Sequence, residues 1–227
     1  MTPARGTGVL RPAPRARLPR RDAMPTAAPR PARPCARRRF PPEVLTDAEV
    51  RALMDACGRG RPTFHRNRAL IAVLYRGGLR VSEALALYPK DLDPASGAVR
   101  VLKGKGGRAR TIGLDPGAFA VLGLWLDARA RLGLSGRSPV FCTARGEPVT
   151  SSYVRRLLAS LGARAGIEKR VHAHGLRHTH AAELRAEGVD IGIISKQLGH
   201  RSIATTARYL DHIAPWAVVE VIRGRAW

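Results

Sequence analysis

The spacing of apolar residues between residues 45 and 213 is the feature that most constrains the fold. From Leu45 onward apolar residues recur at intervals of three and four in one segment after another, the pattern of amphipathic helices on a shared core. The pattern changes once, at residues 97–114 (GAVRVLKGKGGRARTIGL), where two short alternating stretches flank a glycine-rich turn. The sequence therefore predicts a mainly α-helical domain with one small β-hairpin.

The ends of several helices are predicted from capping residues. Thr46 and Glu49 have the spacing of a capping box, and Gly77 with Gly78 should end the second helix. Asp190 and Ser202 are suitable N-caps. The expected helical segments are residues 45–57, 66–78, 79–88, 116–133, 151–166, 176–188, 190–199 and 200–212.

The charge of the chain indicates a polyanionic partner, and nucleic acid is the expected one. Lys and Arg number 40 against 17 Asp and Glu, a net charge of +23. Residues 1–40 contain 11 arginines, 8 of the 17 prolines and one acidic residue, a composition that cannot bury a core. We expect a disordered basic tail over residues 1–40, which either binds DNA phosphates or has no role, and a folded domain over residues 41–227.

Other compositional features exclude several classes of protein. Cys35, Cys57 and Cys142 are too scattered for a disulfide framework or a zinc knuckle. No apolar run is long enough to span a membrane, and the N-terminus lacks the apolar core of a secretory signal. A cytoplasmic location, away from any membrane, is therefore expected.

Four histidines and one arginine lie within residues 171–180, VHAHGLRHTH. His174 and His178 are four residues apart, the spacing with which a helix presents two zinc ligands on one face. Arg177 would point to the same face. Because a permanently charged guanidinium repels a dication and binds phosphate well, the arginine favours a phosphate site over a metal site.

Six polar residues and their surroundings carry a family resemblance. The stretches GLRVSEAL, KGKGGRAR, HGLRHTHA and LGHRSIATTARYLDH resemble, in this order, the motifs of the tyrosine recombinase (phage integrase) family. The resemblance covers residues 45–213 and implies the fold of a tyrosine recombinase catalytic domain over residues 41–227. It implies six catalytic residues: Arg80, Lys105, His174, Arg177, His200 and Tyr209.

The resemblance implies a site-specific recombinase or integrase that breaks and rejoins double-stranded DNA through a 3′-phosphotyrosyl intermediate, with no metal, nucleotide or other cofactor. The residue types suit this chemistry. Arg80 and Arg177 would clamp the non-bridging oxygens of a pentacoordinate phosphorane. Tyr209 would be the nucleophile that attaches to the strand.

Three further residues would move protons or hold the phosphate. Lys105, on the hairpin turn, would protonate the departing 5′ oxygen; Lys103 competes for this role, but the family pattern places the lysine within GKG. His200 would donate a hydrogen bond to a non-bridging oxygen. His174 would handle the tyrosine proton or fix the phosphate.

Four neighbouring residues are assigned supporting roles or none. Glu83 is expected to support Arg80, unless it only caps the helix. We expect His178 to hydrogen-bond backbone within the fold, whereas His172 and His180 look incidental to catalysis. His180 stands where the family more often has an aromatic residue, a difference that should affect packing.

The chain also departs from the family pattern. Most members carry an N-terminal helical domain that clamps the DNA, and the segment before Leu45 looks too short and proline-rich for one. The sequence leaves open whether an accessory DNA-binding protein replaces the clamp or the domain binds DNA by itself. The segment after Tyr209 is expected to pack on a neighbouring subunit of a tetrameric synapse, or on its own domain.

Two other functions stay open at this point. One is a DNA-binding remnant of a mobile-element integrase that no longer recombines. The other is a relaxing topoisomerase of the same chemistry, which fits less well because such enzymes are usually monomeric clamps.

Overall fold

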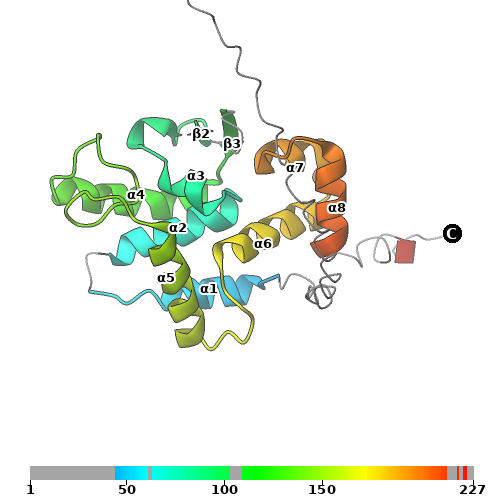
Figure 1. Ribbon diagram of the computed structural model, residues 1–227, viewed down its shortest axis with the longest axis horizontal. Coiled ribbons are helices and arrows are strands. Elements are labelled where there is room, and N and C mark those ends of the chain that lie inside the picture. Colours follow the sequence, from blue (N-terminus) through cyan, green and yellow to red (C-terminus); the bar gives the residue numbers. More distant parts are fainter. Residues whose placement is uncertain (1–43, 61–62, 103–108, 214–218, 220–221, 224–227) are drawn as a thin grey trace, which may run out of the picture. The chain divides into compact units, whose positions relative to one another are not determined.

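The computed structural model describes residues 44–60, 63–102, 109–213, 219 and 222–223. The elements between Asp47 and Ile213 are almost all helices, with one small sheet (Figure 1). The predicted mainly helical fold is therefore confirmed. In chain order the elements are α1 (Asp47–Asp55), α2 (Phe64–Arg76), α3 (Val81–Leu85), η1 (Pro89–Asp91), β1 (Leu92–Asp93), β2 (Ala98–Val101), β3 (Arg110–Gly113), α4 (Pro116–Arg131), α5 (Ser151–Arg164), α6 (Ala173–Ala186), α7 (Ile191–Leu198) and α8 (Ile203–Ile213).

The helix caps largely follow the sequence signals. Thr46 and Glu49 form the predicted capping box, and the Asp190 carboxylate caps α7. Several boundaries differ by two or three residues. α3 spans only Val81–Leu85 of the predicted residues 79–88. α6 begins at Ala173, three residues before the predicted segment. The cause is His172, whose Nδ1 accepts a hydrogen bond from the Gly175 backbone N–H at 3.0 Å and so supplies the N-cap. His174 consequently lies on the helix.

The predicted hairpin is present and gains a third strand. β2 and β3 pair antiparallel, with Val99 opposite Ile112 and Val101 opposite Arg110. β1 adds to the other edge of β2. The two residues of β1 are too few to display an alternating pattern, which is why the sequence did not predict it. The turn that contains Lys103 and Lys105 lies outside the described residues.

The main core surrounds α2. Residues 69–75 of α2 are buried on every side, as expected for a helix that is apolar all round. α2 packs against α4 and α6, and Trp125 of α4 is fully buried, with its indole N–H donating to the Val140 carbonyl at 2.7 Å. This packing fixes the C-terminal end of α2, where the candidate site begins.

A second, smaller core joins α6, α7 and α8. Its buried members are Ala181, Ile194, Leu198 and Leu210. Tyr209 and Val44 pack against them from the rim. Figure 1 shows α7 and α8 next to each other near α6, in agreement with the contacts among these three helices. The helix that carries Tyr209 is therefore held directly against the helix that carries Arg177.

Replacing Gly78 with alanine is expected to destabilise the fold substantially. Gly78 has φ +58°, and an added Cβ would lie 2.5 Å from Cδ2 of His180 and 3.1 Å from Cδ2 of Leu198. Backbone strain and overpacking together should lower the free energy of unfolding by about 2–4 kcal/mol. Gly188 is the matched control, because its φ is +76° and nothing lies within 4 Å of an added Cβ. Urea denaturation should therefore give about 1 kcal/mol for Gly188→Ala, and equal losses would contradict the packing argument.

Candidate active site

The turn between α2 and α3 places Arg80. Arg80 is the N-cap of α3, and Glu83 accepts hydrogen bonds from its backbone N–H and from its side-chain Nη1, each at 2.9 Å. The Glu83 side chain is 1% exposed and that of Arg80 29% exposed. One buried carboxylate thus fills both roles weighed for Glu83: it supports Arg80 and it caps the helix.

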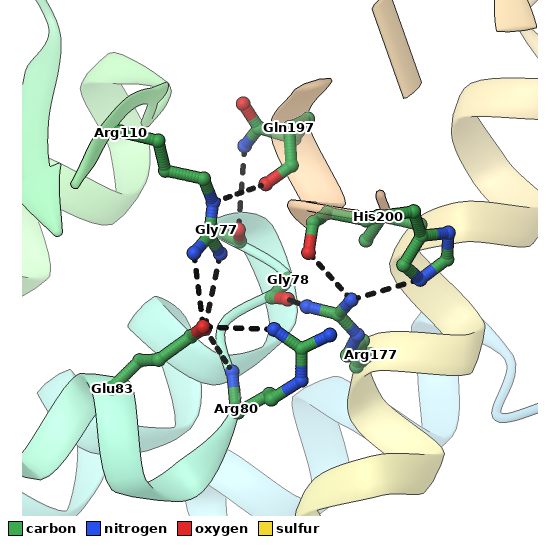
Figure 2. Close-up of polar contacts among 9 residues, drawn as sticks. Gly77, Gly78, Arg80, Glu83, Arg110, Arg177, Gln197 and His200 are labelled. Carbon is green, nitrogen blue, oxygen red and sulfur yellow. Dashed lines mark hydrogen bonds and ion pairs between the residues drawn. The ribbon is translucent and has the colours of Figure 1, made fainter. Parts of the chain in front are cut away.

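The same carboxylate binds a third residue, which the sequence did not single out. Arg110 donates from Nη1 and Nη2 to the two oxygens of Glu83, at 2.9 and 3.0 Å (Figure 2). Burial by itself would raise the pKa of Glu83, but the hydrogen bonds from Arg110 and Arg80 lower it to about 2. Glu83 is therefore ionised at neutral pH and carries its charge between two guanidinium groups.

Arg177 lies at the centre of the site and is almost completely buried. It is 1% exposed, and its terminal nitrogens donate to the backbone carbonyls of Gly78 and Leu198, each at 2.6 Å. Burial, followed by the charge of Arg80, lowers the pKa of Arg177 to about 10, so the group stays protonated at neutral pH. Figure 2 shows its guanidinium beside that of Arg80. Two like charges held together favour binding of an anion between or above them.

His200 connects Arg177 to the helix that carries Tyr209. His200 Nε2 lies 3.1 Å from Nη2 of Arg177, and Nδ1 lies 2.9 Å from the hydroxyl of Thr206 in α8. Because a guanidinium only donates, Nε2 is the acceptor and Nδ1 carries the proton. Burial and then the charge of Arg177 lower the pKa of His200 to about 4. The predicted donation from His200 to phosphate therefore requires exchange of the Arg177 contact or protonation of the ring.

Tyr209 lies among three histidine rings. Its ring centroid is 5.0 Å from that of His178, 5.2 Å from that of His200 and 6.3 Å from that of His174. The phenolic oxygen is buried and has no hydrogen-bond partner among the described residues. Burial raises the pKa of Tyr209 to about 12, although the charge of Arg177 opposes this rise. Tyr209 is thus a protonated phenol close to two positive charges.

The four histidines of residues 171–180 have four different surroundings. His172 caps α6, His174 is exposed, and His178 stacks on Tyr209 while its ring centroid lies 4.3 Å from that of His174. His180 is 5% exposed and packs against Gly78, and its burial lowers its pKa to about 4. In the part of the chain that the structure describes, no three His, Cys, Asp or Glu side chains are grouped to hold a metal ion.

The structure thus brings together five of the six predicted catalytic residues. Arg80, Arg177, His174, His200 and Tyr209 come from α3, α6, α8 and the turn after α7, yet they converge on one place. Lys105 lies outside the described residues, but the strands on either side of its turn are described, and Arg110 belongs to the strand pair next to that turn.

Comparison with known proteins identifies the family of the chain. The model of the phage integrase family matches residues 43–214. The chain belongs to the phage integrase family. Tyrosine recombinase XerD of Bifidobacterium longum is 33% identical to this chain over 189 residues. The matched region covers 79% of this chain and 61% of the relative. The chain therefore spans about three fifths of the length of this curated relative.

Solved structures of the same family share the fold. The crystal structure of XerA recombinase superposes with a TM-score of 0.71 at 31% identity, over 83% of this chain and 67% of the other. XerH site-specific recombinase bound to a palindromic difH substrate gives a TM-score of 0.66 at 27% identity, over 82% of this chain and 54% of the other. This integrase-family chain therefore has the fold of a tyrosine recombinase catalytic domain.

None of the described helices is both long and apolar enough to cross a membrane.

Proposed function

We propose that this chain is a site-specific tyrosine recombinase, which cleaves and rejoins double-stranded DNA through a 3′-phosphotyrosyl intermediate. The main support is that the buried Tyr209 phenol lies close enough to Arg177 and Arg80 for both charges to lower its pKa against the effect of burial. Recombinase relatives and a solved complex of XerH with its difH substrate support the same class of reaction.

The residues can be assigned to steps of the reaction. The phosphate of one strand would bind at the guanidinium groups of Arg80 and Arg177, which stabilise the extra negative charge of the phosphorane. Tyr209 would attack the phosphorus and form the covalent bond that conserves the energy of the phosphodiester. Since its pKa is about 12, the phenol must lose its proton during attack, and His174, on the neighbouring helix, is the expected acceptor or the residue that fixes the phosphate.

We propose that the chain acts on double-stranded DNA together with further copies of itself. Double-stranded DNA would be the substrate, and a homotetramer assembled on two DNA sites would bring four such centres together. An accessory DNA-binding protein would supply the further DNA contacts that an N-terminal clamp domain makes in other members. The predicted role of the segment after Tyr209 in joining subunits concerns residues that lie mostly outside the described part of the chain.

Covalent capture tests the proposed function directly. The full chain would be incubated with supercoiled plasmids that carry overlapping segments of the DNA around its own gene, in the presence of EDTA. A denaturing gel should show protein joined to DNA, and 3′-end mapping should place the protein on the 3′ phosphate. Binding to these plasmids without any adduct would instead identify a DNA-binding remnant.

Substituting Lys105 tests the identity of the general acid. Lys105→Ala should slow cleavage of normal DNA severely, by about 100-fold to 10,000-fold. On a substrate with sulfur in place of the bridging 5′ oxygen the defect should largely disappear, because a thiolate leaves without a proton. Lys103→Ala is the matched control and should cleave both substrates at nearly the wild-type rate. A Lys105→Ala defect that persists on the sulfur substrate would make the lysine a phosphate-positioning charge and leave His174 as the next candidate acid.

A further inference from the structure

Arg110 contacts two parts of the site, the Glu83 carboxylate and the end of α7, without belonging to the expected catalytic set. Its two terminal nitrogens donate to both oxygens of Glu83, and its Nε donates to the Gln197 carbonyl at 3.4 Å. The Arg110 side chain is 15% exposed. Figure 2 shows the guanidinium groups of Arg110 and Arg80 both directed at the Glu83 carboxylate. Arg110 therefore contacts the carboxylate that holds Arg80, whereas it acts on Arg177 through its charge, which adds to the effect of burial in lowering the pKa of Arg177.

The sharing of Glu83 has a consequence for the charge of the site. Arg80, Arg110 and Arg177 contribute three positive charges and Glu83 one negative charge, a net charge of +2 for these four groups. A phosphodiester carries one negative charge, and the phosphorane carries about two. Removing Arg110 would lower the net charge of the remaining three groups to +1, and would leave the Glu83 carboxylate with Arg80 as its single cationic partner among the described residues.

We propose that Arg110 is a positioning residue that neutralises Glu83, so that the charge of Arg80 stays available to the scissile phosphate. This inference rests on the proposed strand-cleavage function. A carboxylate without Arg110 would attract Arg80 more strongly and offset its charge, because electrostatic interactions are strong where side chains are buried. Arg110 acts on the phosphate through Glu83 and Arg80, and does not touch it.

Arg110 also packs against the turn that leads to His200. An added Cβ at Gly199 would lie 2.7 Å from the guanidinium carbon of Arg110, so this side chain lies directly against the glycine. Gln197 of α7 is hydrogen-bonded to the same strand, β3. Its side chain donates to the Gly113 carbonyl at 2.8 Å and accepts from the Gly113 N–H at 3.0 Å. A purely structural role of Arg110 is therefore the alternative that an experiment has to separate from the charge role.

A pair of substitutions separates the two roles. Arg110→Met should reduce the rate of covalent adduct formation by about tenfold to a hundredfold, the usual scale for a residue that orients a functional group. Adding Glu83→Gln restores the net charge of the cluster to that of the wild type and keeps an acceptor for Arg80. The double variant should therefore cleave at least about tenfold faster than Arg110→Met alone. If Arg110 were only structural, the second substitution would reduce activity further.

A second readout does not depend on finding the DNA site. Inorganic sulfate should stabilise the full chain against thermal unfolding by binding at the two arginines. Arg110→Met should raise the sulfate concentration for half-maximal stabilisation by about tenfold, and the double variant should return it to within about threefold of the wild type. Arg76→Met is the matched control: it removes the same charge from ion pairs to Asp115 (2.9 Å) and Glu183 (3.2 Å) and should leave the midpoint unchanged.

The results of these experiments decide whether Arg110 acts by neutralising Glu83. Where the wild type forms adducts, failure of Glu83→Gln to rescue Arg110→Met overturns the inference while the proposed function stands. Where the wild type forms none, the proposed function fails and the sulfate midpoints alone decide the charge role. If Arg110→Met does not fold, Arg110→Lys replaces it; because lysine keeps the charge without the fork, a midpoint within about threefold of the wild type supports the inference and a larger shift overturns it.

Discussion

Tyr209→Phe is expected to abolish covalent adducts completely while leaving the fold and DNA binding intact. The substitution removes only the phenolic oxygen, which is buried without a hydrogen-bond partner among the described residues. Loss of an unsatisfied buried hydroxyl should leave the free energy of unfolding unchanged or raise it by up to about 1 kcal/mol. The ring contacts with His178 and His200 are kept by phenylalanine. Denaturing gels for adducts, urea denaturation and a gel-shift titration measure the three properties.

Tyr153→Phe is the control for this prediction. Tyr153 is another tyrosine of the domain, but its hydroxyl contacts Arg66, and its ring centroid lies 5.0 Å from the carbon of that guanidinium. The Tyr153 variant should therefore form adducts at close to the wild-type rate. Adducts that persist in Tyr209→Phe and vanish in Tyr153→Phe would exchange the two assignments.

Arg177→Ala should have the second-largest effect, because this residue serves both catalysis and the fold. Loss of a donor to the transition-state charge should slow strand cleavage by about a hundredfold to a thousandfold. Removal of the side chain also leaves the carbonyls of Gly78 and Leu198 without their donor, at a cost of about 1–3 kcal/mol in the free energy of unfolding. Urea denaturation and single-turnover cleavage at a temperature where the variant is folded measure the two effects.

Arg80→Ala separates catalysis from stability. Arg80 has a side chain that is 29% exposed and paired with Glu83, and it donates to neither carbonyl that Arg177 holds. Cleavage should fall on a scale similar to that of Arg177→Ala, but with a smaller loss of stability. If both variants lose the same free energy of unfolding, the hydrogen bonds from Arg177 to the two carbonyls do not contribute the stability expected of them. If neither loses activity, the two arginines do not hold the reacting phosphate.

Local patterns in the sequence predicted most of the elements correctly. Helical spacing, the Thr46–Glu49 capping box and the Asp190 N-cap are properties of neighbouring residues, and the structure contains them. The start of α6 was predicted too late, because a histidine cap at His172 is not among the common capping residues. β1 was missed because two residues show no period. The boundary predicted at residue 40 lies outside the described residues and stays a prediction.

Local sequence patterns were enough to predict the helical class of the fold, the hairpin and a set of residue types that suit phosphoryl transfer. Tertiary structure alone decided how those residues are held. Arg110 is 27 residues from Glu83 along the chain, and Arg177 donates to carbonyls that no sequence pattern marks. It also decided that Nε2 of His200 accepts from Arg177, since that follows from the contacts of both ring nitrogens. The physical reason is that periodicity and capping act over a few neighbouring residues, whereas buried charges are balanced by whichever groups the folded chain brings within hydrogen-bonding distance.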